Sequence, residues 1–233
     1  MANVQPQETQ KFHLHEPSRE NAGISGFVLA GGRSSRLHRD KVLLPWKEAT
    51  LLDHAIQRLR QVGDSVCICA NRDDLAGFGL PILHDAAPHA GPLGGIVAAL
   101  EQSQTPWNLF LAVDLPLLPV HLLQTLARRA ASEPAGTLCI VPQVDGLPQP
   151  LCGMYHRSLC DGLRQALNGG KYKIMRAVRE ATAAIPGSRV ELFEVLSETS
   201  IDEVRDWFLN VNTPEDWERA RQLAPLRGFS EAD

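Results

Sequence analysis

The chain has 233 residues and a formal net charge of −4 at pH 7, with 44% hydrophobic and 21% charged residues. This composition is typical of a globular domain with a core of ordinary size. The slight acidic excess argues against a broad basic face, so neither nucleic acid nor a membrane surface is an expected partner. A small phosphate ligand remains compatible with this charge.

The amino-terminal segment is polar and lacks periodicity, so we expect residues 1–22 to form a disordered tail. This segment contains neither the apolar region of a signal peptide nor a run long enough to cross a bilayer. Five cysteines without secretory context argue against a disulfide framework. We therefore expect a cytoplasmic protein with one domain over residues 23–225 and a short tail over residues 226–233.

Short apolar runs of strand length alternate with segments of helical periodicity along most of the chain. The expected strands cover residues 26–30, 65–70, 81–84, 109–113 and 137–141. The expected helices between them cover residues 51–62, 93–103 and 121–131. This alternation predicts an α/β fold with a mostly parallel, doubly wound sheet and helices on both faces.

The distal third of the chain continues with weaker patterns of the same kind. The expected elements are strands at residues 151–155 and 190–195 and helices at residues 159–167 and 174–181. Thr213 is a suitable N-cap, and Pro214 suits the first helical position. We therefore expect a closing helix to begin at this point.

The segment LAGGRSSRLHRDK, residues 29–41, concentrates positive charge directly after the first predicted strand. It would emerge at the carboxyl end of the sheet, where open α/β sheets bind their ligands. Gly31 and Gly32 would let backbone N–H groups approach a ligand closely, and the cations oppose phosphate charge. The segment therefore predicts a nucleoside triphosphate site, with a solvated cationic turn as the alternative. It fits neither the Walker nor the dinucleotide glycine pattern.

The same segment resembles the Leu-Ala-Gly-Gly-x-x-x-Arg-Met-Gly-x-Asp-Lys signature of molybdenum cofactor guanylyltransferases, which are Rossmann-like, GT-A-like nucleotidyltransferases. Further resemblances follow in the family's order: ANRDD (70–74), HDAAPHAGPLGG (84–95), AVDLPLLP (112–119) and LNVNTPEDW (209–217). Together the motifs extend over nearly all of residues 26–223. The sequence departs from the pattern at Leu37, His38 and Gly94, which replace methionine, glycine and alanine.

The resemblance implies transfer of GMP from Mg-GTP to the terminal phosphate of molybdenum-molybdopterin, forming molybdopterin guanine dinucleotide and pyrophosphate. Such a displacement requires alignment and charge neutralisation rather than covalent help from the protein. The resemblance also implies Mg²⁺ as the cofactor, GTP and molybdenum-molybdopterin as the substrates, and molybdoenzymes or their chaperones as protein partners.

Three residues are the candidates for catalysis. Arg36 and Lys41 match basic positions of the family signature and could neutralise the phosphates, whereas Arg33 and Arg39 fall at variable positions. Asp114 ends an apolar strand before a proline turn, so its carboxylate is expected at the ligand edge of the sheet. A hard oxygen ligand suits Mg²⁺, which makes Asp114 the expected metal ligand, with turn capping as the alternative role.

Asn71 and Asp85 follow the second and third expected strands, and by resemblance they contact the guanosine portion of GTP. A carboxylate can accept hydrogen bonds from ribose hydroxyls or from the guanine N–H edge, while Asx turns are the alternative role. Asn210 and Asn212 are implied on the pterin side, with turn formation as their alternative. The expected nucleotide-binding set is Leu29, Ala30, Gly31, Gly32, Lys41, Asn71, Asp85 and Asp114.

Three other functions remain open. A cytidylyltransferase acting on the same cofactor is the nearest, but in that branch the loop resembles Ala-Ala-Gly rather than the Leu-Ala-Gly-Gly found here. Sugar-phosphate nucleotidyltransferases share the fold and usually have longer chains. A non-catalytic nucleotide-binding module would be able to dispense with Asp114.

Overall fold

Parallel pairing around β1 (Ile24–Leu29) organises the molecule, whose computed structural model describes residues 23–31, 40–87, 90–132, 135–196 and 200–225. The eight-stranded sheet has the order β10-β7-β9-β6-β1-β4-β5, and β8 pairs with β7 outside this path. Its other strands are β4 (Ser65–Cys69), β5 (Ile82–Leu83), β6 (Trp107–Ala112), β7 (Thr137–Val144), β8 (Leu147–Pro148), β9 (Cys152–His156) and β10 (Arg189–Glu194). The expected tails lie outside the described residues.

The pairs β1·β4, β1·β6, β4·β5 and β7·β10 are parallel, which confirms the predicted mostly parallel sheet. The exception is β9, which runs antiparallel to both β6 and β7. Only residues 145–151 connect β7 to β9, and this connection is too short for the crossover that a parallel pair requires. The reversal of β9 is therefore a consequence of the short connection.

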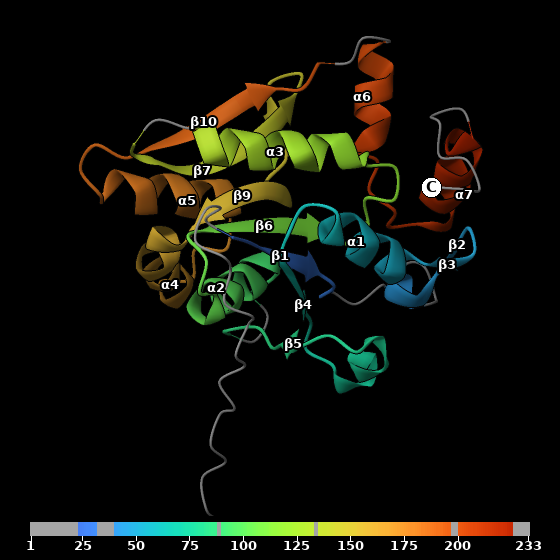
Figure 1. Cartoon of the computed structure of the whole chain (residues 1–233), viewed down its shortest axis with the longest axis horizontal. Coiled ribbons are helices and arrows are strands. Elements are labelled where there is room, and N and C mark those ends of the chain that lie inside the picture. The colour runs from blue at the N-terminus through green and yellow to red at the C-terminus, as the bar shows by residue number, and fades with distance from the viewer. Residues whose placement is uncertain (1–22, 32–39, 88–89, 133–134, 197–199, 226–233) are drawn as a thin grey trace, which may run out of the picture.

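Helices cover both faces of the sheet (Figure 1). They are α1 (Leu51–Arg60), α2 (Pro92–Gln102), α3 (Val120–Ser132), α4 (Cys160–Asn168), α5 (Ile174–Ala183), α6 (Ile201–Trp207) and α7 (Pro214–Leu223). Buried residues of α1, α3, α6 and α7 belong to one apolar cluster, and those of α2, α4 and α5 belong to a second. Alternate residues of β1 divide between the clusters, Val28 in the first and Phe27 in the second, as the period of a strand requires.

The expected elements are confirmed with small differences at their ends. Thr213 accepts a hydrogen bond from the backbone N–H of Asp216 and caps α7, with Pro214 in the first helical position, as predicted. Periodicity did not predict α6, the hairpin of β2 (Pro45–Trp46) and β3 (Ala49–Thr50), or the 3-10 turns. These pieces are too short to show a period. The 3-10 turns are η1 (Lys41–Leu43), η2 (Asp73–Phe78) and η3 (Arg157–Leu159).

The carboxyl-terminal part of the chain returns to the first half of the domain. Figure 1 shows α7 beside the β2–β3 hairpin, and the rings of Trp46 and Trp217 lie 5.5 Å apart. The backbone N–H of Val211 also donates to the carbonyl of Asp114 over 3.0 Å. The segment before α7 is therefore attached to the turn that follows β6.

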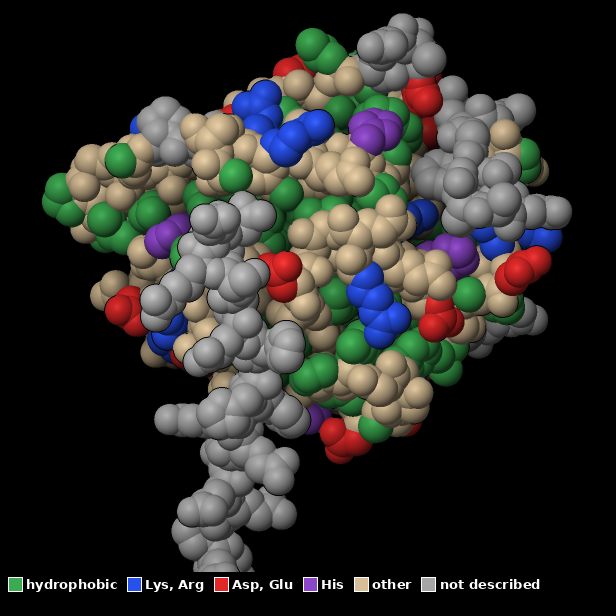
Figure 2. Space-filling model, viewed as in Figure 1, with side chains coloured by type: hydrophobic (Ala, Val, Ile, Leu, Met, Phe, Trp, Pro, Cys, Tyr) green, Lys and Arg blue, Asp and Glu red, His purple; other side chains and the backbone are tan. Residues whose placement is uncertain are grey.

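The surface agrees with the charge balance of the sequence. On the face shown in Figure 2, the described Lys and Arg side chains are interspersed with Asp and Glu and form no continuous patch of either sign. None of the helices in the described part of the chain combines the length and the apolar character that crossing a membrane would need.

A buried polar cluster lies at the amino-terminal end of β6, away from the carboxyl ends of the parallel strands. Asn108 is 0% exposed, and its amide nitrogen donates to the carbonyl of Tyr155 over 3.2 Å. The hydroxyl of Ser103 donates to the amide oxygen of Asn108. This side chain thus connects β6 to β9 and to the end of α2.

We predict that Asn108→Ala lowers the free energy of unfolding by about 1–3 kcal/mol, because it leaves buried partners without hydrogen bonds. Urea denaturation of both proteins measures the difference. Thr125→Ala is the matched control, since that hydroxyl donates to the carbonyl of His121 on an exposed helix surface. The control should change stability by less than about 0.5 kcal/mol, and equal effects of the two substitutions would contradict the assignment.

Candidate functional site

The carboxyl ends of β1, β4 and β6 and the loops that follow them enclose a pocket of about 200 Å³. Parallel strands direct the polar residues after them to one edge of the sheet, which places segments distant in sequence around one cavity. The lining residues are Leu29, Gly31, Lys41, Cys69, Asp85, Gly91, Pro92, Gly95, Ala112, Val113, Asp114 and Leu151. We call this cavity the nucleotide pocket, after the ligand that the sequence predicts at this edge of the sheet.

Lys41 and Asp114 form an ion pair in this pocket, with Nζ of the lysine 2.9 Å from Oδ2 of the aspartate. Each side chain is 16% exposed, so the pair is screened from water far more than a surface pair. Lys41 also donates to Oδ1 of Asn212 over 2.7 Å. The first 3-10 turn, the turn after β6 and the segment before α7 therefore meet at one ammonium group.

The other carboxylate oxygen of Asp114, Oδ1, is buried and has no hydrogen-bond partner among the residues that the structure describes. A desolvated carboxylate oxygen is costly unless a donor or a cation meets it. The described residues contain no group of three or more His, Cys, Asp or Glu that could hold a metal by themselves. A single carboxylate fits Mg²⁺, which takes most of its other ligands from substrate phosphates and water.

Asn71 and Asp85 are brought together, as their places after β4 and β5 predict. The amide nitrogen of Asn71 donates to Oδ2 of Asp85, and the backbone N–H of Asp85 donates to Oδ1 of Asn71, both over 2.7 Å. Partial burial raises the pKa of Asp85, and the hydrogen bond from Asn71 opposes that rise. Because both ends of its amide bind Asp85, Asn71 fixes that carboxylate beside the pocket.

The absence of a side chain at Gly95 leaves room beside Asp85 at one wall of the pocket. A Cβ added at Gly95 would lie 3.3 Å from Oδ1 of Asp85 and 3.3 Å from the Cβ of Cys69. Gly91 precedes α2 with φ +60° and ψ −156°, a conformation that is essentially restricted to glycine. Pro92 then begins the helix, and the amino terminus of α2 lines the pocket. Sequence reasoning assigned no role to Gly91 or Gly95, although their Gly-Pro-Leu-Gly-Gly context was a signal for a helix start at a ligand.

The first loop is only partly described. Leu29 and Gly31 line the pocket, whereas the backbone N–H of Ala30 donates to the carbonyl of Cys69 over 2.9 Å and is occupied within the sheet. Gly32 and Arg36 lie outside the described residues, as do Arg33 and Arg39. Their expected roles therefore stay predictions.

A second pocket, of about 270 Å³, adjoins the first, because Pro92 and Leu151 line both. We call it the acceptor-side pocket, because it is lined by Asn210, which the sequence analysis places on the side of the acceptor. Its further lining residues are Leu115, Gln149, Pro150, Cys152, Tyr172, Ile174, Met175 and Asn210. Asn210 therefore faces the second cavity, while Asn212 contacts Lys41 in the first. The structure separates the two asparagines that the sequence had placed together.

The chain is similar to known proteins in sequence and in structure. The model of the MobA-like NTP transferase domain matches residues 26–184. A probable molybdenum cofactor guanylyltransferase from Carboxydothermus hydrogenoformans is 32% identical over 200 residues, which are 86% of this chain and 96% of that protein. The molybdenum cofactor guanylyltransferase from Cupriavidus metallidurans is 39% identical over 158 residues, covering 65% of this chain and 78% of the relative.

Solved structures show the same fold at low identity. Molybdopterin-guanine dinucleotide biosynthesis protein A from Archaeoglobus fulgidus superposes with a TM-score of 0.70 at 22% identity, covering 87% of this chain and 99% of the other. The 2-C-methyl-D-erythritol 4-phosphate cytidylyltransferase from Thermus thermophilus gives a TM-score of 0.62 at 18% identity, covering 87% and 99%. The expected GT-A-like fold is confirmed. With this fold, and with the domain match over residues 26–184, the chain belongs to the MobA-like NTP transferase family and is a nucleotidyltransferase.

Proposed function

We propose that the protein transfers GMP from Mg-GTP to the terminal phosphate of molybdenum-molybdopterin, forming molybdopterin guanine dinucleotide and pyrophosphate. The observation that carries this proposal is the Lys41–Asp114 pair beside two pockets that share a wall. A transfer between two substrates requires a nucleotide and an acceptor bound next to each other with their phosphates together. The names of the relatives from Carboxydothermus and Cupriavidus support the choice of GTP and of this acceptor.

In this proposal GTP occupies the nucleotide pocket. Leu29 and Gly31 line the wall next to the phosphates, and Asp85, held by Asn71, accepts hydrogen bonds from guanine or ribose. The amino terminus of α2 adds the positive end of the helix dipole, which favours an anion. The base is therefore recognised at one end of the pocket and the triphosphate at the other.

Lys41 and Arg36 are the two cations that neutralise the negative charge of the phosphates. Asp114 would hold Mg²⁺, and its buried, unpartnered Oδ1 supports that role. When bound, Mg²⁺ supplies positive charge that stabilises the negative charge developing on the phosphate oxygens. Because Lys41 bonds both Asp114 and Asn212, it aligns the metal ligand with the segment before α7.

Molybdenum-molybdopterin would bind in the acceptor-side pocket. Tyr172 is 50% exposed at its rim, Ile174 and Met175 add apolar surface, and Asn210 and Gln149 supply hydrogen-bonding groups. A ring system needs this combination of an apolar wall and a few polar contacts. Asn210 therefore keeps its role on the pterin side, whereas Asn212 acts through Lys41.

The remaining parts of the proposal concern the setting of the enzyme. We propose a cytoplasmic protein with one catalytic domain over residues 23–225, which passes its product to molybdoenzymes or their chaperones. The competing function is the cytidylyltransferase acting on the same cofactor, since the same fold is found in the Thermus cytidylyltransferase. The Leu-Ala-Gly-Gly loop favours GTP over CTP.

The decisive experiment incubates the purified protein with Mg²⁺, loaded molybdopterin and each nucleoside triphosphate in turn. We expect mass spectrometry to find the guanine dinucleotide and pyrophosphate, with CTP used far less, because the wrong base leaves buried polar groups unpaired. Equal or better use of CTP in direct competition would show that the cytidylyltransferase is the correct function.

The cations of the first loop should differ in importance. We predict that Lys41→Ala and Arg36→Ala each reduce kcat/KM for GTP at least about tenfold, which corresponds to about 1.4 kcal/mol for a charge-assisted hydrogen bond. Arg33→Ala and Arg39→Ala, at variable positions of the signature, should change it only slightly. Similar losses in all four variants would indicate a diffuse cationic patch instead of a phosphate cradle.

The Asn71–Asp85 pair predicts a change in pH dependence. Asn71→Ala removes a donor that lowers the pKa of Asp85, so this pKa should rise further above its usual range. If the ionised carboxylate binds the nucleotide, kcat/KM for GTP will then fall at a higher pH on the acid side of the profile. Asn168→Ala, at an exposed position at the end of α4, is the control and should leave the profile in place. An unchanged acid limb in Asn71→Ala would contradict the role of Asp85.

A further inference from the structure

Arg58 is a charged residue in the interior of the molecule. It lies on α1 and is 7% exposed, among the buried residues Leu51, Leu52, Ala55, Ile56 and Leu59 of the same helix. Its position follows Leu51 by two helical turns and Ala55 by one, so it belongs to the stripe that faces the sheet. An arginine on the inner stripe of an amphipathic helix is uncommon, because burying a guanidinium is costly unless its donors are bonded.

The guanidinium donates to two consecutive backbone carbonyls. Nη1 donates to the carbonyl of Leu115 over 3.1 Å, and Nη2 donates to the carbonyl of Pro116. Burial lowers the pKa of Arg58 to about 10, which leaves the group charged at neutral pH. A planar fork that bonds two successive carbonyls restricts both the position and the direction of that stretch of backbone.

The two carbonyls belong to the turn that carries Asp114. The residue on the other side of the aspartate is also fixed, because the N–H of Val113 donates to the carbonyl of Leu29 over 3.2 Å. The carbonyl of Asp114 itself accepts from Val211. Sheet bonds thus hold the turn from one side, and Arg58 holds it from the other.

The orientation of this turn decides where the carboxylate of Asp114 points. Its Oδ2 meets Lys41, and its Oδ1 is the buried oxygen without a partner among the described residues. A small rotation of the backbone after β6 would change the direction of the Asp114 carboxylate relative to the pocket that this residue lines. A group that fixes the carbonyls after Asp114 therefore acts on the metal ligand without contacting substrate.

We propose that Arg58 is a positioning residue, which holds the Leu115–Pro116 backbone so that the carboxylate of Asp114 is directed at the metal bound with the nucleotide. This inference rests on the proposed function. It extends the site from the cavity to the inner face of α1. Substituting residues that fix the orientation of a metal ligand typically reduces metal affinity or activity by about 10- to 100-fold.

The experiment compares the affinity for a non-hydrolysable GTP analogue with and without Mn²⁺, by calorimetry on the full-length protein. We define the metal gain as the dissociation constant without Mn²⁺ divided by the dissociation constant with Mn²⁺. This ratio separates the contribution of the bond between protein and metal from the contacts that the nucleotide makes alone. Asp114→Asn should bring this gain close to one. Arg58→Met, which keeps the length and removes the donors, should reduce the gain about tenfold while metal-free nucleotide affinity stays unchanged.

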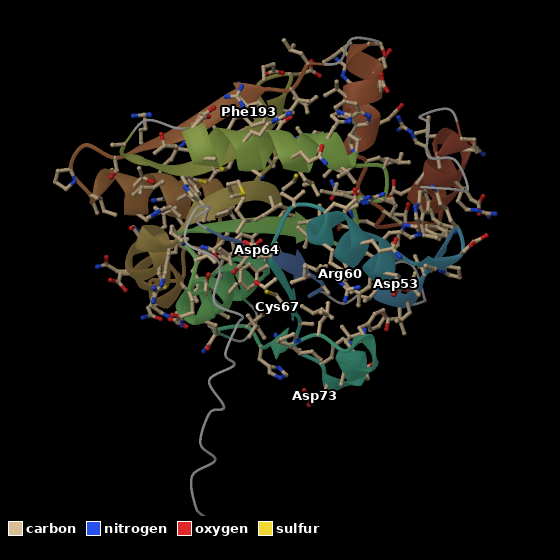
Figure 3. All side chains as sticks on the ribbon, viewed as in Figure 1. Asp53, Arg60, Asp64, Cys67, Asp73 and Phe193 are labelled. Atoms are coloured by element: carbon tan, nitrogen blue, oxygen red, sulfur yellow. The ribbon has the colours of Figure 1, made fainter. Side chains whose placement is uncertain are left out.

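Two further variants make the test specific. Arg58→Lys keeps the charge but loses the fork, so its metal gain should lie between those of the unsubstituted protein and Arg58→Met. Arg60 lies on the same helix (Figure 3) and is exposed. Arg60→Met is therefore the matched control, and its gain should be unchanged. Circular dichroism and urea denaturation check that each variant is folded. If Arg58→Met does not fold, Arg58→Lys decides.

The outcomes separate the inference from the proposed function. A full metal gain in folded Arg58→Met, or in folded Arg58→Lys when the methionine variant does not fold, would overturn the positioning role even if stability falls. If the unsubstituted protein shows no metal gain with the GTP analogue, the metal role of Asp114 fails, and the inference fails with it. A reduced gain in the Arg58 variants, together with normal Arg60→Met, supports the inference.

Discussion

The site depends on the partly desolvated ion pair between Lys41 and Asp114. At 16% exposure the two side chains interact in a medium that screens charge less than water does, so each fixes the other. The same ammonium bonds Asn212. One contact thus attaches the end of the first loop, the turn after β6 and the segment before α7. Removing the lysine would leave a buried carboxylate without its cation, which is why a single substitution should disturb several parts of the site.

The parallel sheet makes this contact possible. The chain enters each of β1, β4 and β6 from the same side, so the residues that follow these strands meet at one edge. On the other side of β6 the neighbouring strand is the antiparallel β9. Leu151, the residue before β9, lines both pockets. The topology therefore accounts for two adjacent cavities with a shared boundary.

Around the pocket, polar side chains are held by hydrogen bonds from other residues. The amide of Asn71 both donates a hydrogen bond to Asp85 and accepts one from it. The guanidinium of Arg58 donates to the backbone that follows Asp114. Arg58 is buried and Asn71 is exposed, and the hydrogen bonds of each side chain limit its freedom. A rigid support of this kind matters for a transfer reaction, because the protein contributes mainly alignment and fixed charge.

The sequence by itself determined the α/β class, most helices and strands, the cap at Thr213, and the places of Asp114, Asn71 and Asp85 at strand ends. These features are local, since periodicity and capping act within a few residues. It could not decide the separation of Asn210 from Asn212, or the bonds of Arg58 to Leu115 and Pro116. The partners in those contacts are far apart in the chain, as Lys41 and Asn212 also are, and only the packing of the sheet, α1 and the segment before α7 brings them together.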